Sequence, residues 1–454
     1  MTEKIDFSLR EVMAASGGVF TGDCTLLDEK ITSAQIDSRL IVPGGIFVAI
    51  KGEKTDGYNY IPSAIENGAL CAVTDRPYDG FPCVVVNSPV TALQDIARAY
   101  RKKLNITVIG ITGSVGKTTT KEIVASVLSE KYNVIKTEGN FNNGLGLPLT
   151  IMSIKKDTEV AVVEMGMNHE GEMRLLSSIA LPTMCIMTNI GMSHIENLGT
   201  RENIFKAKCE VFEHMSTTAR CILNGDDDLL STLNRPNRCL FGFDRDNDIF
   251  VESFLEHGFE GSDFEISLFG EKINCHINVP GRHVLFSAMA AMAAGSWLGL
   301  TGSQITEGVS KAKSLSGRVN VIRTPKYTLI DDCYNAAPQS MKSGIDLLVK
   351  SDDYPRSVCI FGDMGELGED EEHFHEEVGE YAAKSKVGLL VAIGPLSKHT
   401  YNGAKKRGGN AIWFETKEEF LKKASEILRG GDAVLIKASH FMDFNKIVSS
   451  LQED

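Results

Sequence analysis

Residues 110–121 read Gly-Ile-Thr-Gly-Ser-Val-Gly-Lys-Thr-Thr-Thr-Lys, and this stretch decides the fold of the middle of the chain. An apolar run at 106–111 predicts a buried strand leading into it, and apolar residues at helical spacing over 123–128 predict a helix after it. A strand, a glycine turn, Gly-Lys-Thr and a helix together predict a phosphate-binding loop. In such a loop Lys117 places its charge toward the β- and γ-phosphates, and Thr118 offers its hydroxyl to a magnesium ion.

The glycines of this loop are not spaced as in the common nucleotide-binding pattern. That pattern, G-x-x-x-x-G-K-[ST], needs a glycine where this chain has Ile111. The glycines are instead Gly113 and Gly116. Ser114 and Thr119 complete the polar part of the loop. The loop therefore predicts phosphate binding, and other motifs must show what happens to the phosphate.

Length, charge and cysteine content limit the class of protein. A chain of 454 residues is too long for one core and predicts about three domains. The formal net charge of −13 disfavours a nucleic-acid partner, because such binding needs a basic surface. We find no signal-peptide pattern, no apolar run near the roughly 18 residues of a membrane helix, and no C-x-x-C pair among the ten cysteines. We therefore expect a cytoplasmic protein without membrane insertion, whose cysteines are small buried thiols.

The chain divides into three predicted domains, at 1–103, 104–316 and 317–454. All three combine short apolar runs with helical patterns, which predicts an α/β fold. In the central domain this alternation predicts a mostly parallel sheet with ligands at the carboxyl ends of the strands. The predicted strands are 46–50, 83–87, 106–111, 160–165, 184–189, 220–224, 327–331, 357–361, 389–393 and 433–437, with extra antiparallel strands in 241–279. Predicted helices include 91–103, with a basic C-terminal end, and 284–298.

Charged and polar side chains follow the predicted central strands. Glu164 ends the run 160–165, where a phosphate-loop domain is expected to place a magnesium ligand, although an acid there also fits a turn or a helix cap. His194 follows the next strand and can complete a second cation site or simply be polar surface. Lys208 lies in a helical pattern and, by itself, is typical of a surface lysine.

Two further stretches are candidates for ligand contacts. The glycine- and asparagine-rich loop 139–150 contains Asn142 and Asn143, which suit a polar, anionic or carbohydrate ligand and equally a cluster of turns. Asp331 and Asp332 end a predicted strand, where carboxylates often bind a ribose or an amine. A paired acid also fits a simple strand-to-helix turn, so both interpretations stay open.

Longer motifs occur in a fixed order along the chain. The central ones are Thr-Gly-Ser-x-Gly-Lys-Thr-Thr, Glu-Met-Gly, Thr-Asn-Ile-Gly-x-x-His-x-Glu and Ala-Lys-x-Glu-x-Phe. The others are Asp-Ser-Arg at 37–39, Gly-Asn-x-Asn-Asn-x-x-Gly-x-Pro-Leu-Thr, Asp-Asp-x-Tyr-Asn-Ala-x-Pro-x-Ser, and Gly-Asp-Met-Gly-Glu-Leu-Gly at 362–368. Together they resemble the Mur ligase family of ATP-dependent amide-forming enzymes. Asp-Ser-Arg resembles the N-terminal domain shared by the later members of the family, and the other three motifs of the second group resemble its dipeptide-adding member.

This resemblance implies an architecture and a reaction. It implies a small N-terminal α/β domain that binds UDP, a central phosphate-loop ATPase domain and a C-terminal Rossmann-like domain. With ATP and Mg²⁺, the carboxylate of a UDP-muramyl tripeptide would attack the γ-phosphate to give an acyl phosphate. The amine of D-alanyl-D-alanine would then attack that carbonyl and release phosphate. The setting would be cytoplasmic peptidoglycan precursor synthesis, by a chain expected to be a monomer.

The resemblance also implies roles for four catalytic residues. Lys117 and the loop amides would hold the β- and γ-phosphates. Thr118 and Glu164 would hold one Mg²⁺, and Glu164 and His194 would share a second. Lys208 falls where related ligases have a carbamylated lysine, whose carboxylate-like group can serve magnesium. In this family context Lys208 becomes a candidate metal ligand.

The remaining implied contacts concern the nucleotide and the UDP-linked substrate. The nucleotide-binding positions outside the loop are His283, Arg318 and Asp332. Positions near the uridine are Ser38 and Arg39, and those facing the muramyl group are Asn142 and Asn143. Two positions depart from the family pattern, because Ser287 replaces a usual adenine-contacting asparagine and His440 replaces a usual arginine. We therefore expect Asn335 or backbone to hold adenine, and a phosphate contact from residue 440 stays open.

Three other classes fit the sequence less well. A sister ligase that adds diaminopimelate or lysine carries an Asp-Asn-Pro-Arg motif where this chain has Asn-Ala-Ala-Pro at 335–338. A folylpolyglutamate-type ligase lacks the UDP domain. A phosphate-loop switch or motor ATPase predicts conventional glycine spacing and an arginine finger.

Overall fold

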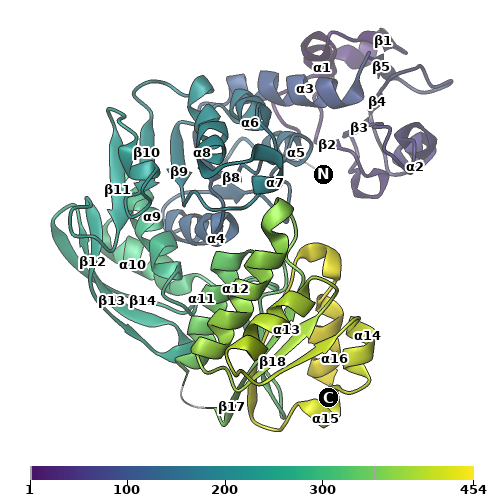
Figure 1. Ribbon diagram of the computed structural model, residues 1–454. Coiled ribbons are helices and arrows are strands. Elements are labelled where there is room, and N and C mark those ends of the chain that lie inside the picture. The colour runs from purple at the N-terminus through teal and green to yellow at the C-terminus, as the bar shows by residue number, and fades with distance from the viewer. Residues whose placement is uncertain (1–2, 352–353, 454) are drawn as a thin grey trace. The chain divides into compact units, whose positions relative to one another are not determined.

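The computed structural model describes residues 3–351 and 354–453. Their strands form three sheets (Figure 1). Two compact units are defined by contacts between Cα atoms. Unit 1 comprises Met1–Thr112, Tyr132–Ile186 and Ala207–Arg220. Unit 2 comprises Gly113–Lys131, Met187–Lys206 and Cys221–Asp454.

The first sheet lies in unit 1 and has the strand order β1-β5-β4-β3-β2. Strands β2 to β5 pair in parallel, and β1 is antiparallel to β5. Its strands are β1 (Val19–Thr21), β2 (Ala34–Gln35), β3 (Ile46–Val48), β4 (Cys71–Thr74) and β5 (Cys83–Val85). Helices of unit 1 include α1 (Leu9–Ser16), α2 (Ile61–Glu66), α3 (Pro89–Lys103), α5 (Gly146–Met152) and α6 (Glu172–Ala180). Two of these strands confirm the predicted runs at 46–50 and 83–87.

Helix α3 confirms the helix predicted at 91–103. The side chain of Ser88 caps it by accepting a hydrogen bond from the backbone N–H of Thr91. The predicted apolar stripe, which includes Ile96, is buried. The end of the helix differs from a solvated basic tail, because Arg101 is only 5% exposed and its Nε donates to the carbonyl of Ala180 at 2.7 Å. This arginine therefore ties the helix end into unit 1.

The second sheet has the strand order β14-β13-β12-β11-β10-β9-β6-β8-β7. Its strands are β6 (Thr107–Thr112), β7 (Val134–Lys136), β8 (Val160–Glu164), β9 (Met184–Met187), β10 (Arg220–Asn224), β11 (Arg238–Gly242), β12 (Ile249–Glu256), β13 (Ser262–Leu268) and β14 (Glu271–Ile277). Pairing is parallel for β6 with β8, β7 with β8, β10 with β11 and β11 with β12. Strands β12, β13 and β14 pair antiparallel, as predicted for 241–279.

Five helices complete this part of the chain. They are α4 (Lys117–Leu128), α7 (Ile195–Leu198), α8 (Arg201–Cys209), α9 (Val284–Trp297) and α10 (Gly302–Lys311). Helix α4, which follows the phosphate loop, packs closely against α10. A Cβ on Gly308 would lie only 2.4 Å from Cα of Val127, so the two helices approach at a distance that only glycine permits. This packing fixes the helix that presents the loop.

The third sheet, in unit 2, has the strand order β15-β16-β20-β17-β18-β19. Its strands are β15 (Asn320–Arg323), β16 (Thr328–Asp331), β17 (Arg356–Gly362), β18 (Leu389–Ile393), β19 (Ala411–Phe414) and β20 (Asp432–Lys437). All pairs are parallel except β15 with β16. Alternate residues of β17 enter different cores, with Cys359 and Phe361 in one and Val358 and Ile360 in the other. Both faces of this sheet are therefore buried.

Six helices cover these two faces (Figure 1). Helices α11 (Pro338–Val349), α12 (Glu371–Lys384) and α13 (Ser397–Lys406) contribute to one core. Helices α14 (Lys417–Leu421), α15 (Ala424–Ile427) and α16 (Asn445–Glu453) contribute to the other. A parallel sheet between two helix layers is a Rossmann-like arrangement, as predicted for this part of the chain.

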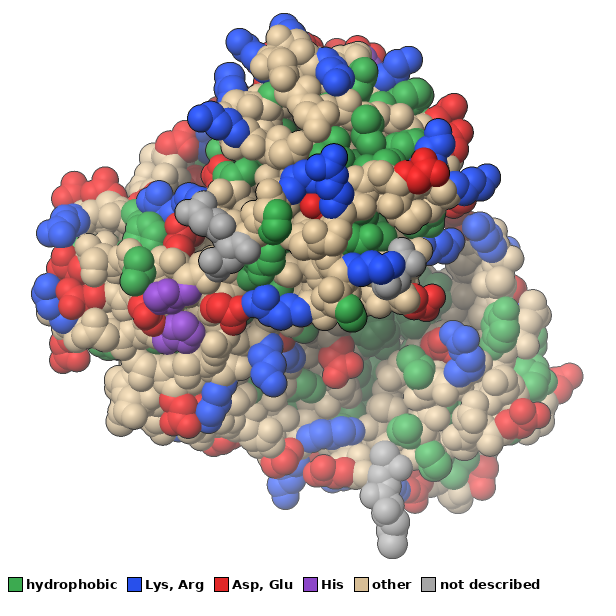
Figure 2. Space-filling view, turned by 90° about the horizontal axis from the view of Figure 1, so that it is seen from below, with side chains coloured by type: hydrophobic (Ala, Val, Ile, Leu, Met, Phe, Trp, Pro, Cys, Tyr) green, Lys and Arg blue, Asp and Glu red, His purple; other side chains and the backbone are tan. Residues whose placement is uncertain are grey.

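The structure also bears on the expectations about membrane insertion, surface charge and buried thiols. In the part of the chain that the structure describes, no helix has the length and apolarity needed to cross a bilayer. Acidic and basic side chains are interspersed on the face drawn in Figure 2. All ten cysteines are free; Cys24 is exposed, Cys209 is partly exposed, and the others are buried. The prediction of buried thiols is confirmed for the majority of them.

Candidate active site

The phosphate loop connects β6 to α4, and its two glycines have separate structural reasons. Gly113 has a φ of 148°, and a Cβ there would lie 1.9 Å from Oγ1 of Thr188. Gly116 is the N-cap of α4 and has a φ of 83°, in the left-handed region that glycine adopts without strain. The spacing that departs from the common pattern therefore matches the two positions where this backbone needs glycine.

Asn189 holds the loop from the segment that follows β9. Its Oδ1 accepts the backbone N–H of Val115 at 2.9 Å, and its Nδ2 donates to the Val115 carbonyl at 3.0 Å. The backbone N–H of Ser114 donates to the Asn189 carbonyl at 3.0 Å. Sequence reasoning assigned no role to Asn189, although it lies in the Thr-Asn-Ile-Gly motif. This residue keeps the loop backbone in one conformation before any ligand binds.

Two cationic side chains lie at the loop and at the N-terminal end of α4. Nζ of Lys117 donates to the carbonyls of Gly113 and Ser114, at 2.9 and 3.4 Å. Nη2 of Arg318 donates to Oγ1 of Thr118 at 3.3 Å. Nε of Arg318 is buried and has no hydrogen-bond partner among the described residues. A buried unpaired N–H is costly, and a phosphate oxygen would satisfy it, so these residues fit a nucleotide phosphate.

His194 lies beside Glu366, which follows strand β17 of the third sheet. Its Nδ1 is buried and forms no hydrogen bond of regular geometry, but it lies 2.6 Å from Oε2 of Glu366, an ion-pair distance. The His194 side chain lowers the pKa of Glu366, and the charge of Lys117 adds to this effect. Glu366 comes from the Gly-Asp-Met-Gly-Glu-Leu-Gly motif, but its pairing with His194 could not be derived from the sequence.

Asp332 forms a buried ion pair in the same unit. Its Oδ2 lies 2.6 Å from Nζ of Lys437, and the side chains of the two residues are 10% and 3% exposed. Its Oδ1 accepts the backbone N–H of Val319 at 3.2 Å, next to Arg318. Lys437 also donates to the carbonyl of Asn335 at 3.0 Å. The predicted nucleotide carboxylate therefore already orders the chain around Arg318.

The residues considered for adenine have different surroundings. His283 is exposed at the N-terminus of α9. Ser287 is 6% exposed, and its hydroxyl lies 2.9 Å from Oγ1 of Thr120, so it joins α9 to α4. Asn335 is exposed, and its Oδ1 accepts the backbone N–H of Ala336 at 2.9 Å. Ser287 is thus engaged between two helices, whereas Asn335 is exposed and uses its side-chain oxygen within its own turn.

Glu164 ends β8 in unit 1 and is 3% exposed. Its Oε1 accepts a hydrogen bond from Nδ2 of Asn142 at 2.9 Å, and its backbone N–H donates to Oγ1 of Thr137 at 2.9 Å. Asn143 does something else: its Oδ1 accepts the backbone N–H groups at the start of α5, including that of Gly146 at 3.0 Å. Neighbouring asparagines that looked equivalent in the sequence therefore have separate roles, one on the carboxylate and one as a helix cap.

Lys208 is 1% exposed in α8. The surface-lysine interpretation from the helical pattern alone is therefore wrong. Burying an ammonium group is costly unless it is paired or chemically altered. This burial suits a lysine with a specific role, and it is compatible with the carbamylation that the family resemblance implies.

The two predicted uridine contacts also differ from each other. Ser38 is 5% exposed, and its hydroxyl donates to Oγ of Ser63 at 3.2 Å. The side chain of Arg39 is 83% exposed, and Oδ2 of Asp37 lies 2.6 Å from its Nη2. Asp37 also accepts the backbone N–H of Arg39 at 3.0 Å. The guanidinium group is therefore presented to solvent on an ordered turn.

The side chains predicted to bind magnesium suit an ion that is bound together with a substrate. Within residues 3–351 and 354–453, no three His, Cys, Asp or Glu side chains converge so that they could hold a metal ion on their own. Mg²⁺ is usually bound through one or two carboxylates together with substrate phosphates and waters. A buried carboxylate such as that of Glu164 and a hydroxyl such as that of Thr118 are each donors of this chemical type.

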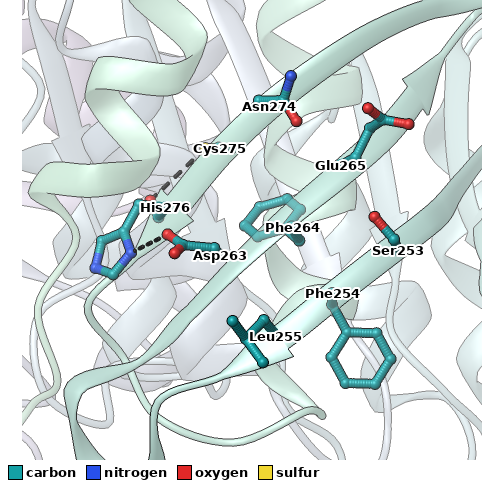
Figure 3. Close-up of a pocket in the computed structure, with 9 residues that line it drawn as sticks. All are labelled: Ser253, Phe254, Leu255, Asp263, Phe264, Glu265, Asn274, Cys275 and His276. Atoms are coloured by element: carbon teal, nitrogen blue, oxygen red, sulfur yellow. Dashed lines mark hydrogen bonds and ion pairs between the residues drawn. The ribbon is translucent and has the colours of Figure 1, made fainter.

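A separate hollow lies on the antiparallel strands β12, β13 and β14 (Figure 3). It has a volume of about 540 Å³ and contains none of the predicted site residues. On its rim, Oδ1 of Asp263 lies 2.7 Å from Nδ1 of His276. His257 lies 2.7 Å from the other oxygen of the same carboxylate. The predicted site and this hollow therefore share no residue.

These features define an α/β protein that binds a nucleotide. They are a glycine loop held by Asn189, two cationic side chains beside it and a second, mostly parallel sheet. Comparison with known families then identifies which one. Residues 30–113 match "Mur ligase family, catalytic domain", 111–295 match "Mur ligase middle domain", and 317–440 match "Mur ligase, glutamate ligase domain". The chain belongs to the Mur ligase family.

Individual relatives cover almost the whole chain. It is 36% identical over 424 residues to the UDP-N-acetylmuramoyl-tripeptide–D-alanyl-D-alanine ligase of Bacillus subtilis strain 168, covering 92% of each chain. It superimposes on the crystal structure of MurF from Acinetobacter baumannii with a TM-score of 0.89, at 28% identity and 99% coverage of both. MurF from Thermotoga maritima in complex with ADP gives a TM-score of 0.81 at 29% identity, covering 93% of this chain and 97% of that one. The predicted family and three-domain α/β fold are confirmed.

Proposed function

We propose that this chain is an ATP-dependent ligase that forms an amide bond between UDP-N-acetylmuramoyl tripeptide and D-alanyl-D-alanine. It releases ADP and phosphate, and it acts in the cytoplasmic synthesis of peptidoglycan precursors. The observation that carries the proposal is the phosphate loop of unit 2, which has the unpaired Nε of Arg318 at its side. Similarity over 92% of the chain to a ligase of this specificity supports the choice of substrates.

The proposed reaction has two steps. An oxygen of the tripeptide's terminal carboxylate attacks the γ-phosphorus of ATP, and ADP leaves with the electron pair of the broken P–O bond. The amine of the dipeptide then attacks the acyl carbon and loses a proton. The C–O bond breaks, and phosphate departs with the former carboxylate oxygen. Both steps need charge neutralisation and positioning more than covalent help from the protein.

The residues of the phosphate loop supply this neutralisation. Lys117 and the loop amides from Gly113 to Thr119 hold the β- and γ-phosphates. Arg318 donates to a phosphate oxygen through its Nε atom, which has no other partner in the described part of the chain. The conformation of the loop is fixed beforehand by Asn189, so binding costs little further ordering. His283, Asp332 and Asn335 complete the proposed nucleotide contacts.

Magnesium is the proposed cofactor. Thr118 and Glu164 are its proposed ligands, His194 is the proposed ligand of a second ion, and Lys208 serves the metal once carbamylated. Bound Mg²⁺ neutralises phosphate charge and orients the reacting oxygens. Asn142 donates to one oxygen of the Glu164 carboxylate and so helps to fix its orientation. Carbamylation would turn the buried cation of Lys208 into an anion of the kind that a metal site needs.

The UDP-linked substrate is proposed to contact two regions of unit 1. Ser38 and Arg39 are the contacts proposed for the uridine end, and the guanidinium of Arg39 is exposed to solvent while it is paired with Asp37. Asn142 and Asn143 belong to the loop proposed to face the muramyl group. We also propose that the enzyme is a monomer with no nucleic-acid partner.

A phosphate-release assay tests the proposed function. The purified chain is incubated with ATP, Mg²⁺, a panel of UDP-linked acceptors and several amines. Phosphate release is expected only when UDP-muramyl tripeptide and D-alanyl-D-alanine are both present, and the variant Lys117→Met is expected to be inactive while folded. Release with a single amino acid and the dipeptide precursor, and none with D-alanyl-D-alanine, would overturn the substrate assignment.

A further inference from the structure

Arg318 is held by contacts on two sides. Its Cζ lies 4.0 Å from the centroid of the Tyr334 ring, so the guanidinium plane is close to the aromatic face. Its Nη2 donates to Thr118 at 3.3 Å, and its Nε has no partner among the described residues. Arginine stacks on aromatic faces while its N–H groups remain free to donate at the edge of the plane. This contact therefore fixes the side chain without using its remaining donors.

Tyr334 is itself fixed from two directions. Its backbone N–H donates to the carbonyl of Gly317 at 3.1 Å. Gly317 has a φ of 74°, and a Cβ there would lie 3.2 Å from Cβ of Tyr334, so the close approach favours glycine. The ring of His440 lies 5.5 Å from the Tyr334 ring, tilted by 36°. The tyrosine ring thus contacts both an arginine and a histidine.

His440 stands where the family pattern has arginine. In this structure His440 is exposed, and the contact described for its ring is with Tyr334. His440 therefore contacts the aromatic ring that lies against Arg318.

We propose that Tyr334 is a positioning residue for the nucleotide, which holds Arg318 beside the N-terminal end of α4 and is supported by His440. The inference rests on the proposed use of ATP. A flexible arginine loses considerable rotamer freedom when it binds an anion. Because contact with a fixed ring already restricts the side chain, less conformational entropy is lost on binding.

ADP affinity of the full-length protein, measured by isothermal titration calorimetry with Mg²⁺, tests this inference. Tyr334→Leu is expected to weaken ADP binding about 5- to 10-fold, within the range of a cation–π contact. Tyr334→Phe is expected to stay within about twofold, because the aromatic face remains. The matched control is Tyr58→Leu, which removes an Arg76–Tyr58 stack of similar distance, 3.9 Å, in unit 1. This control is expected to leave ADP affinity unchanged.

A double-mutant cycle separates positioning from general packing. In the Arg318→Ala background, Tyr334→Leu is expected to have no further effect on ADP affinity, because its target is gone. Additive losses would overturn the inference, and so would equal effects of the Leu and Phe variants. Tyr334→Met, which keeps apolar volume without a ring, takes the place of the Leu variant if that one does not fold.

The two proposals fail in different ways. A wild-type protein that binds no ADP would overturn both. A wild-type protein that binds ADP, together with an unaffected Tyr334→Leu variant, would overturn only the role of Tyr334. His440→Ala is expected to weaken ADP binding about twofold through the tyrosine, and no change would remove His440 from the arrangement.

Discussion

Nδ1 of His194 lies 2.6 Å from a carboxylate oxygen of Glu366, and both residues have left-handed backbone conformations, with φ of 66° and 62°. Such conformations are uncommon for residues other than glycine and are retained mainly where the surrounding structure requires them. The contact directs Nδ1 toward the acid and leaves Nε2 for another partner. Carboxylate groups orient metal-binding histidines in this manner.

Glu366→Ala should therefore raise the Mg²⁺ concentration needed for half-maximal phosphate release. Loss of an orienting partner of a metal-binding histidine typically costs about 10- to 100-fold in affinity or activity. Glu369→Ala is the matched control, because Glu369 is an exposed acid three residues further along the chain. An unchanged Mg²⁺ requirement in Glu366→Ala would remove Glu366 from this role.

Substitution of the two asparagines of loop 139–150 should give separate effects. Asn142→Ala removes the donor to the buried Glu164 carboxylate, so phosphate release should fall by about tenfold or more while the fold is kept. Asn143→Ala removes the cap of α5, so it should lower the free energy of unfolding by about 1 kcal/mol. Steady-state rates and urea unfolding of both variants measure this. Equal effects on activity and stability would contradict the two roles.

Lys208→Ala should lose activity, because the proposed carbamate cannot form. High bicarbonate together with short-chain acids should partly restore it, since a small carboxylate can occupy the space left by the side chain. The matched control is Lys206→Ala, in the same helix but exposed. Full activity of Lys208→Ala without additives would exclude Lys208 from the site.

His375 makes stability depend on pH. It is fully buried; its Nε2 accepts the backbone N–H of Met364 at 3.0 Å, and its Nδ1 lies 2.7 Å from the carbonyl of Glu371. Burial lowers its pKa, so the folded state keeps the ring neutral while the unfolded state binds a proton below about pH 6.5. The neutral, buried ring of His375 therefore contributes fully to the free energy of unfolding above about pH 6.5, and this contribution is lost as the pH falls.

Urea unfolding at pH 7.5 and 5.5 measures this contribution. Between these pH values the wild type should lose about 1 kcal/mol more unfolding free energy than His375→Gln, which has no titrating group at this position. The same pH dependence in both proteins would show that His375 takes up a proton in the folded state.

The sequence predicted elements with strong local patterns. Strands β10 and β18 coincide with the predicted runs 220–224 and 389–393, because each contains an apolar run bounded by polar residues or by glycine. Strands β1, β2, β4, β7, β15 and β19 were missed. Strand β4 lies inside its sheet and is buried, but it has only four residues, so its apolar run is short. Strands β7 and β15 were missed for another reason. Both lie at sheet edges and are only partly buried, so neither has the apolar run by which a buried strand is recognised.

Site residues were predicted where a motif carries the chemistry, and missed where distant contacts decide it. Gly113 and Lys117 follow from local spacing alone. The hydrogen bonds between Asn189 and Val115 and the pairing of His194 with Glu366 join segments far apart in the chain. A single sequence contains no information on such proximity, and the burial of Lys208 depends on tertiary packing in the same way.

The central claim is that the chain activates a carboxylate as an acyl phosphate. It is tested by following oxygen from the terminal carboxylate of UDP-muramyl tripeptide labelled with ¹⁸O. The released phosphate, analysed by mass spectrometry after reaction with ATP and D-alanyl-D-alanine, should contain one ¹⁸O atom per amide bond formed. Phosphate without ¹⁸O, released together with the amide product, would contradict the account.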